Sequence, residues 1–163
     1  MRHSRIFMIS LMLAVIVTAA SFAAGPKAYV GIFKDNAVAV LDTETNRVLR
    51  TIAIPPGPHG LAVTPNGRTV YASSDGDSKV SVIDTATDAV VKAIDVGKSP
   101  HGLAMTPDGK TLLAAVFGAG QVAFIDTASN TVVATLPVAS PHNIAISPDG
   151  RTAYVAAQGK GAL

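Results

Sequence analysis

The chain contains no cysteine among its 163 residues. This absence excludes disulfides, covalently attached c-type haem, thiolate metal sites and a cysteine nucleophile. Aromatic residues make up only 5% of the chain, which is too few to form a platform on which nucleic-acid bases could stack. Glutamate occurs once, as Glu44. Stability must therefore come from the packing of apolar side chains, which are abundant.

Motifs of the common catalytic sites are also missing. The sequence has no Gly-x-Ser-x-Gly, no phosphate-binding glycine loop and no His-Glu-x-x-His. We therefore assign no catalytic residue, and the protein is more readily explained as a binding protein than as an enzyme.

The first 23 residues have the composition of an export signal. Arg2 and Arg5 precede the apolar run "IFMISLMLAVIVTAA", and the segment ends in Ser21, Phe22 and Ala23, which resembles a cleavage site. We expect residues 1–23 to be a signal peptide and the mature protein to be periplasmic, secreted or on the cell surface. The alternative is an uncleaved membrane anchor, although the run is short for a spanning helix. After cleavage we expect no stable membrane insertion.

Signal removal also changes the charge of the chain. The 13 basic residues include Arg2 and Arg5, and the remainder balance the 11 acidic residues. A neutral mature chain has no basic stripe that would attract phosphates. We therefore expect no nucleic-acid partner.

The remainder of the chain consists of repeats. "VLDTETNRVLRTI" from Val40, "VIDTATDAVVKAI" from Val82 and "FIDTASNTVVATL" from Phe124 align with one another. Their aspartates, Asp42, Asp84 and Asp126, are 42 residues apart. A second shared segment contains a proline and histidine pair, and its histidines are His59, His101 and His142. A fixed period of this length indicates a repeat architecture.

Each repeat contains four short β-prone runs. In the third copy they are "HGLAMT", "TLLAAVF", "QVAFIDT" and "TVVATLPV", at 101–106, 111–117, 121–127 and 131–138. Turn residues separate them, because proline fixes φ, aspartate or asparagine closes an Asx turn and glycine accepts positive φ. These structural turn residues are Pro65, Asn66, Gly67, Pro107, Asp108, Gly109, Pro148, Asp149, Gly150, and the aspartates Asp42, Asp84 and Asp126.

Four antiparallel strands in each unit of about 42 residues are typical of a β-propeller. We predict an all-β propeller of four-stranded antiparallel blades, with two complete blades and two partial ones. The domain would cover residues 24–163. Its blades are a partial one at 28–54, complete ones at 58–96 and 100–138, and a partial one at 141–163.

The strands "AYVGIF", "VYASSD" and "AYVAAQ", with the "VIDTATDAVV" segments, carry a family resemblance. Residues 28–163 resemble the YVTN-type β-propeller repeat of exported bacterial proteins and archaeal surface-layer proteins. The third unit departs from the pattern, since Leu113 replaces the tyrosine. The resemblance implies a ring of about seven blades, and this scaffold serves many unrelated functions.

The strand count predicts that the chain begins at the second strand of one blade and stops at the third strand of another. We expect a truncated product from which the remaining blades of the propeller are missing. The alternative is a short protein that closes its ring by assembling with other copies.

Alternating strand directions place the loops on two faces. The histidine-containing loops and the variable loops "FKDNA", "SDGDSK" and "FGAGQ" share one face. We consider His59, His101 and His142 as candidate ligands for a metal, a haem-like cofactor or an anion. The alternative is that each histidine anchors the neighbouring blade. Asp75 and Asp77 are weaker candidates for a hard cation such as calcium.

The leading functional expectation is an exported binding or scaffold protein with no bound cofactor, whose partner is a protein, a polymer or a small ligand. The first alternative is the propeller domain of a periplasmic haem- or quinone-linked oxidoreductase, with the histidines facing the cofactor. The second is a lactonase-like hydrolase, which would need a metal-binding glutamate at the channel.

Overall fold

The computed structural model describes residues 25–158, so the predicted signal peptide at 1–23 lies outside the described residues. No helix in the described part is long and apolar enough to cross a membrane. The strands are β1 Lys27–Ile32, β2 Ala37–Asp42, β3 Arg47–Ala53, β4 Pro58–Val63, β5 Thr69–Ser74, β6 Lys79–Asp84, β7 Ala89–Asp95, β8 Pro100–Met105, β9 Thr111–Val116, β10 Gln121–Asp126, β11 Thr131–Pro137, β12 Pro141–Ile146 and β13 Ala153–Ala157. Two short 3-10 turns, η1 Phe33–Asp35 and η2 Phe117–Ala119, follow β1 and β9.

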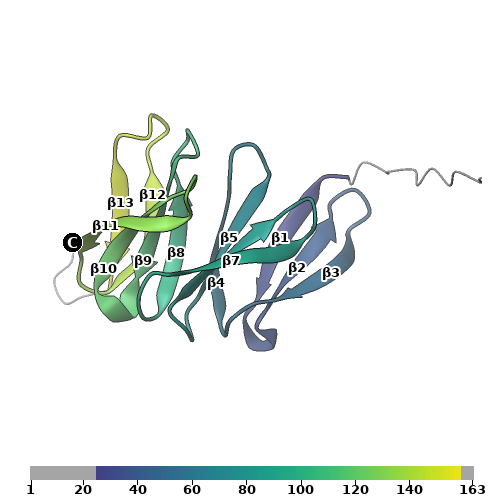
Figure 1. Cartoon of the computed structure of the whole chain (residues 1–163), viewed down its shortest axis with the longest axis horizontal. Helices are drawn as coiled ribbons and strands as arrows, with labels where there is room; N and C mark the ends of the chain where they lie inside the picture. Colours follow the sequence, from purple (N-terminus) through teal and green to yellow (C-terminus); the bar gives the residue numbers. More distant parts are fainter. Residues whose placement is uncertain (1–24, 159–163) are drawn as a thin grey trace, which may run out of the picture.

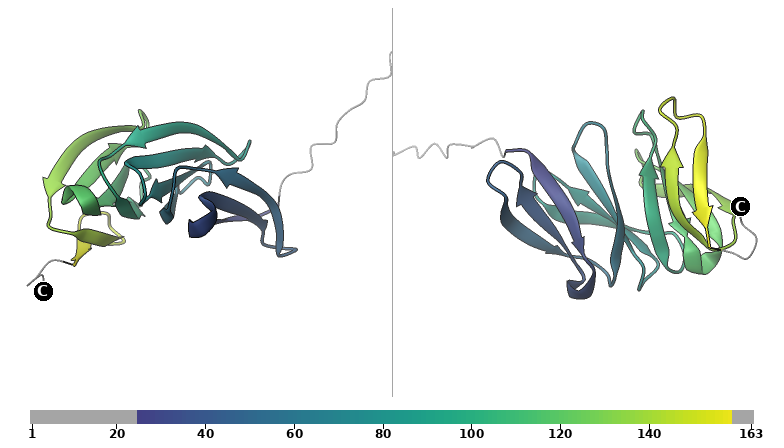
Figure 2. Two further views of the ribbon diagram at one scale, coloured as in Figure 1. Left: turned by 90° about the horizontal axis from the view of Figure 1, so that it is seen from below. Right: turned by 180° about the vertical axis from the view of Figure 1, so that it is seen from behind.

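The strands form separate antiparallel sheets in chain order (Figure 1). Two sheets have four strands, β4 to β7 and β8 to β11, while β1 to β3 form a three-stranded sheet and β12 and β13 a two-stranded one. The sheets stand side by side in an arc that does not close into a ring (Figure 2). This arrangement confirms the predicted propeller of two complete and two partial blades.

The cores lie between neighbouring sheets. Val38 and Val40 of β2 lie in one core cluster with Val70 and Ile83 of the next sheet. The following interface repeats this packing with another cluster, which includes Tyr71, Val80, Val82, Leu112 and Ile125. Because middle strands are covered on both sides, β9 reads as the continuous apolar run Leu112 to Val116, every residue of which is buried.

The turns of each sheet are closed by short polar side chains. Asp108 Oδ1 accepts a hydrogen bond from the Lys110 backbone N–H at 3.1 Å, and Gly109 has a φ of +71°. A left-handed φ of this kind costs glycine no steric strain. In the hairpin between β6 and β7, Asp84 Oδ1 likewise accepts the Thr87 N–H at 2.8 Å. Hydrogen bonds from the Thr87 hydroxyl and then from its backbone N–H lower the pKa of Asp84.

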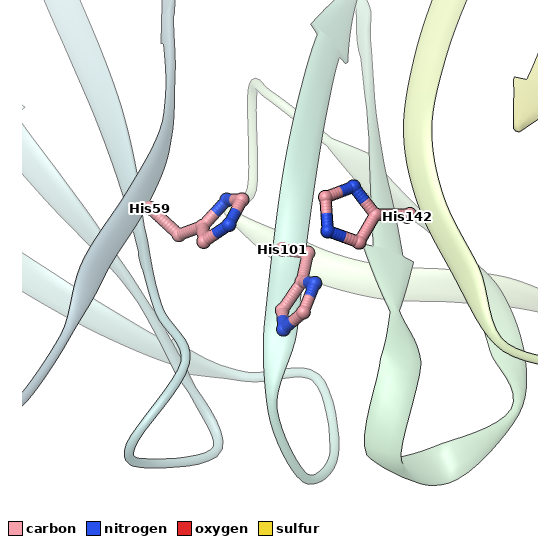
Figure 3. Close-up of side chains that lie close together, drawn as sticks. All are labelled: His59, His101 and His142. Carbon is pink, nitrogen blue, oxygen red and sulfur yellow. The ribbon is translucent and has the colours of Figure 1, made fainter. Parts of the chain in front are cut away.

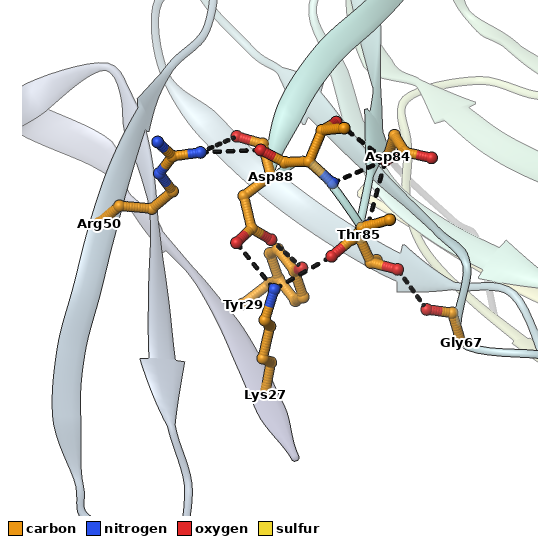
Figure 4. Close-up of polar contacts among 9 residues, drawn as sticks. Lys27, Tyr29, Arg50, Gly67, Asp84, Thr85 and Asp88 are labelled. Carbon is orange, nitrogen blue, oxygen red and sulfur yellow. Dashed lines mark hydrogen bonds and ion pairs between the residues drawn. The ribbon is translucent and has the colours of Figure 1, made fainter. Parts of the chain in front are cut away.

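Side chains of one sheet reach the turns of the next. The Tyr29 hydroxyl donates to Asp88 Oδ1 at 2.6 Å, and Lys27 Nζ pairs with Asp88 Oδ2 at 2.8 Å (Figure 4). At the following interface, the Tyr71 hydroxyl donates to Asn130 Oδ1 at 2.7 Å. Tyr29 and Tyr71 are one repeat apart, as are Asp88 and Asn130, so the repeat preserves a contact between blades. We call the side of the blades that carries these turns the turn face.

Candidate functional site

The three repeated histidines sit in β-bulges of the innermost strands. In β4, Pro58 pairs with Ser74 but Leu61 pairs with Ala72, so one extra residue is inserted around His59. The same register shift occurs between Pro100 and Leu103 in β8, and between Pro141 and Asn143 in β12. A bulge bends its strand and redirects a side chain. The irregularity thus sets the histidine positions apart from the regular ladder.

The glycine after each of the first two histidines allows the inner strands to approach closely. A Cβ atom on Gly102 would lie 2.6 Å from the His142 carbonyl oxygen and 2.9 Å from Asn143 Cα. A Cβ atom on Gly60 would collide with the His101 carbonyl oxygen in the same way. Only glycine fits such a contact between backbones. The repeated His-Gly pair therefore brings histidines of neighbouring blades together.

The imidazole rings of His59, His101 and His142 converge from β4, β8 and β12 (Figure 3). One ring nitrogen of each lies within 4.8 Å of those of the other two. His59 and His101 stack with centroids 4.5 Å apart, and His142 stands nearly perpendicular to His101 at 4.7 Å. His59 is exposed, His142 is half-buried and His101 is buried. The cluster is therefore open to solvent on the His59 side.

His101 is held in place on several sides. Its Nε2 lies 2.8 Å from Asp75 Oδ1, which belongs to the loop between β5 and β6 of the preceding blade. Its ring also stacks on Phe117 at a centroid distance of 4.9 Å, and its carbonyl oxygen accepts the Ser73 hydroxyl. In contrast, Nδ1 of His101 is buried and has no hydrogen-bond partner within residues 25–158. A buried polar atom without a partner costs free energy.

The electrostatics at His59 favour its neutral ring. Partial desolvation of the ring, one face of which stacks on His101, lowers the pKa of His59; positive charge on His101 or His142 would lower it further, while Asp75 acts in the opposite direction. Imidazolium groups at such short separations repel one another. In its neutral form His59 offers an unprotonated nitrogen atom, which is a ligand for metal ions.

The structure separates the two aspartates that the sequence grouped together. Asp75 faces His101, whereas the Asp77 carboxylate accepts the Ser78 backbone N–H and the Asp77 carbonyl accepts the Ser99 N–H. Within residues 25–158, the three histidines form the one group of three or more potential metal-ligating side chains. Glu44 lies in the hairpin between β2 and β3, on the turn face. The described residues thus bring no glutamate to the histidines.

Sequence reasoning did not identify Phe117 as a neighbour of the histidines. Phe117 follows β9 at the same repeat position that Asp75 occupies after β5. Phe33, after β1, occupies this position in the first unit. The 42-residue alignment could have shown that this loop position varies in chemistry and lies on the histidine side, which we call the histidine face.

A cavity lies away from the histidines, between β1 and β4. Its volume is about 580 Å³, and Tyr29, Leu61 and Val63 are among its lining residues. The polar ends of Lys27 and Tyr29, which also line it, are already engaged by Asp88. No free polar side chain of this pair remains to orient a ligand there, so the histidine face is the stronger candidate.

Comparisons with known proteins agree with this architecture. The YNCE-like beta-propeller family matches residues 14–106 and 69–160. The chain belongs to this family. No curated protein matches it.

Among solved structures, a chain of Kuenenia stuttgartiensis Hydrazine Synthase is similar, with 30% sequence identity and a TM-score of 0.79. The match covers 85% of this chain and 40% of the hydrazine synthase chain. The present chain therefore spans less than half the length of that relative.

Proposed function

We propose that this YNCE-like propeller is an exported, non-catalytic binding protein that uses its histidine face to hold a ligand. The observation that carries the proposal is the convergence of three imidazole rings, with ring nitrogens within 4.8 Å, from three successive blades. An export signal at residues 1–23 and a periplasmic, secreted or cell-surface location are part of the proposal. So is a YVTN-type repeat, supported by "AYVGIF" and "VYASSD".

The surroundings of the cluster support a binding role. His59 is exposed, so a ligand can reach the cluster from solvent, and the adjoining loops differ between blades, with Asp75 and Phe117 at equivalent positions. Variable loops on a repeated scaffold are where binding specificity usually resides. The sheets cover only part of a ring (Figure 2), so we propose that further blades complete the binding face.

A haem- or quinone-linked oxidoreductase propeller is the second candidate. The similarity to a chain of Hydrazine Synthase, an enzyme by its name, favours it. In that case His101, held by Asp75 and Phe117, would face the cofactor. The two candidates differ in a visible property, because haem absorbs strongly in the visible range and a non-catalytic binding protein need not.

Native mass spectrometry and absorption spectroscopy of the full chain, purified without chelator from its exported location, test the proposal. We expect a non-covalently bound mass that is lost in the His59→Ala/His142→Ala double variant, and no intense haem-like absorption band. The Asp77→Asn variant, altered on the same face but outside the cluster, should retain the mass. An intense haem-like band that depends on His101 would favour the second candidate instead. Wild-type protein with no bound mass would contradict both.

A further inference from the structure

We infer that His59, His101 and His142 bind a late first-row divalent metal ion, such as Zn²⁺ or Cu²⁺. This inference rests on the proposed binding function and names the class of ligand. Its starting point is the cluster itself, in which one ring nitrogen from each histidine lies within 4.8 Å of the others. The three residues come from three different sheets, so a bound ion would join successive blades.

The state of His101 is the second and independent observation. A carboxylate only accepts hydrogen bonds, so the contact of 2.8 Å between Asp75 Oδ1 and His101 Nε2 requires a proton on Nε2. In the neutral ring, Nδ1 then carries a free lone pair and no proton. This atom is buried and has no partner among the described residues. A metal ion would satisfy it, whereas no described side chain lies within hydrogen-bonding distance of it.

The contact with Asp75 is itself characteristic of metal sites. Histidines that ligate metals almost always donate their other ring N–H to a carboxylate, a carbonyl or a water, which fixes the tautomer and the ring orientation. Phe117 adds a parallel stacking contact with ring centroids 4.9 Å apart. His101 is thus the preorganised member of the cluster, held by a charged group on one edge and an aromatic ring on one face.

The chemistry of the donors selects the class of ion. Three imidazoles suit zinc, copper and nickel, whereas calcium and magnesium prefer carboxylate, carbonyl and water oxygens. Anion binding by the same residues is disfavoured because the Asp75 carboxylate lies 2.8 Å from His101 Nε2 and already engages that nitrogen. Three protein ligands also leave a coordination position open, which would face solvent beside the exposed His59.

Metal binding requires a small rearrangement. Nitrogen ligands on a tetrahedral ion lie about 3.3 Å apart, closer than the 4.8 Å limit observed here. In addition, His59 stacks parallel to His101 with 10° between the ring planes, so the in-plane lone pairs of these two rings do not yet converge. His59 is exposed and no hydrogen bond to its ring is present in the described part of the chain. We therefore expect His59 to turn toward the ion while His101 remains in place.

Metal titration of the full chain after chelator treatment tests the inference. Zn²⁺ or Cu²⁺ is added in competition with a chromophoric chelator, and we expect one ion to bind per chain, with Ca²⁺ failing to compete. His59→Ala should weaken binding at least 100-fold. The Cu²⁺ form should show nitrogen hyperfine coupling in its electron paramagnetic resonance spectrum, and this coupling should decrease in His142→Ala.

Asp75 and Asp77 provide a matched pair of controls in one loop. Asp75→Asn should weaken metal binding about 10-fold to 100-fold, because loss of an outer carboxylate typically has this effect. Asp77→Asn should change it less than twofold, because Asp77 does not contact the cluster. Circular dichroism of each variant verifies that it is folded. Nitrogen chemical shifts of metal-free protein should also show His101 protonated at Nε2.

Two results would overturn the inference. One is Zn²⁺ and Cu²⁺ affinity no higher than that for Ca²⁺; the other is unchanged affinity in folded His59→Ala and His142→Ala variants. If metals do not bind but the exported protein still carries a mass that depends on these histidines, the metal assignment fails and the proposed function stands. If neither metal nor any other mass depends on them, both fail.

Discussion

Tyr71 and His101 show how the two faces of the blades differ. Each recurs at its position in other repeats, each is buried, and each contacts a neighbouring blade. The Tyr71 hydroxyl is fully engaged by Asn130, at 2.7 Å. His101 pairs with Asp75 through Nε2, but its Nδ1 has no partner in the part of the chain that the structure describes. Recurrence alone therefore does not separate the two residues, whereas the hydrogen bonding of their side-chain polar atoms distinguishes His101 from Tyr71.

The largest expected effect is on the approach of the inner strands. Gly102→Ala would place a Cβ atom 2.6 Å from the His142 carbonyl oxygen, so β8 and β12 must separate. We expect a loss of about 3 kcal/mol in the free energy of unfolding, together with loss of metal binding. Urea denaturation measures the first. Gly25→Ala is the control, since its Cβ would lie at an ordinary 3.6 Å from Glu44; equal stability of the two variants would contradict the close-contact argument.

The next effect concerns the ion pair of the turn face. Lys27 and Asp88 are 2.8 Å apart with side chains 14% and 11% exposed. Lys27→Thr or Asp88→Asn alone should destabilise the fold by about 2 kcal/mol, because each leaves a largely buried charge without its partner.

The double variant recreates the composition of the following interface, where Thr69 and Asn130 occupy the two positions. We therefore expect the second substitution to restore much of the stability lost in the first. A double-mutant cycle by thermal or urea unfolding checks this coupling. Additive losses would show that the ion pair is not the source of the effect, and metal affinity should not change in any of the three variants.

A smaller effect is expected at Tyr71. Tyr71→Phe keeps the ring in the core but removes the donor to Asn130 Oδ1, so we expect a loss of about 1 kcal/mol. Leu113, one repeat later, is not a tyrosine, so Leu113→Met provides a control of similar volume that removes no hydrogen bond. A Tyr71→Phe variant as stable as the wild type would mean that the hydroxyl contributes nothing net to the interface.

At His59, by contrast, we expect a substitution to affect metal affinity and to leave stability almost unchanged. Its ring is exposed and the described structure gives it no hydrogen bond, so His59→Ala should change the free energy of unfolding of metal-free protein by less than about 0.5 kcal/mol. The affinity of this variant for Zn²⁺ or Cu²⁺ should nevertheless fall strongly. A large stability loss without any metal would instead identify the histidine as an anchor between blades, the alternative that the sequence also allowed.

The smallest effect concerns the pH dependence of stability that Asp126 gives to the turn face. Hydrogen bonds from Ser129 lower the pKa of Asp126. A carboxyl with a lowered folded-state pKa stabilises the fold above its unfolded pKa, near 3.9, and this contribution is lost as pH falls through the folded value. Asp126→Asn removes this contribution, so stability at pH 7 should fall slightly, and the difference from the wild type should shrink as pH falls through the folded pKa. Unfolding curves between pH 2 and 7 would show an unaltered acid slope if Asp126 were not involved.

The sequence predicted the blades because their determinants are local. The 42-residue period, the Asx turns at Asp108 and Asp84 and the buried run in β9 each follow from residues close together in the chain. Strand direction also predicted correctly that the histidines share a face with the loop containing Asp75. The contact between Asp75 and His101 could not be derived, because it depends on how closely one blade approaches the next. The sequence pattern instead suggested that Asp75 and Asp77 act together.

The bulges at the histidines have an evolutionary consequence. Each inserts a residue that stands outside the regular pairing of its inner strand. A change of side chain at position 59, 101 or 142 therefore need not shift the register of the sheet or expose its core. During evolution, such a repeat could therefore acquire new chemistry at one histidine position at a time, while the hydrogen bonds of the turn face preserved the fold.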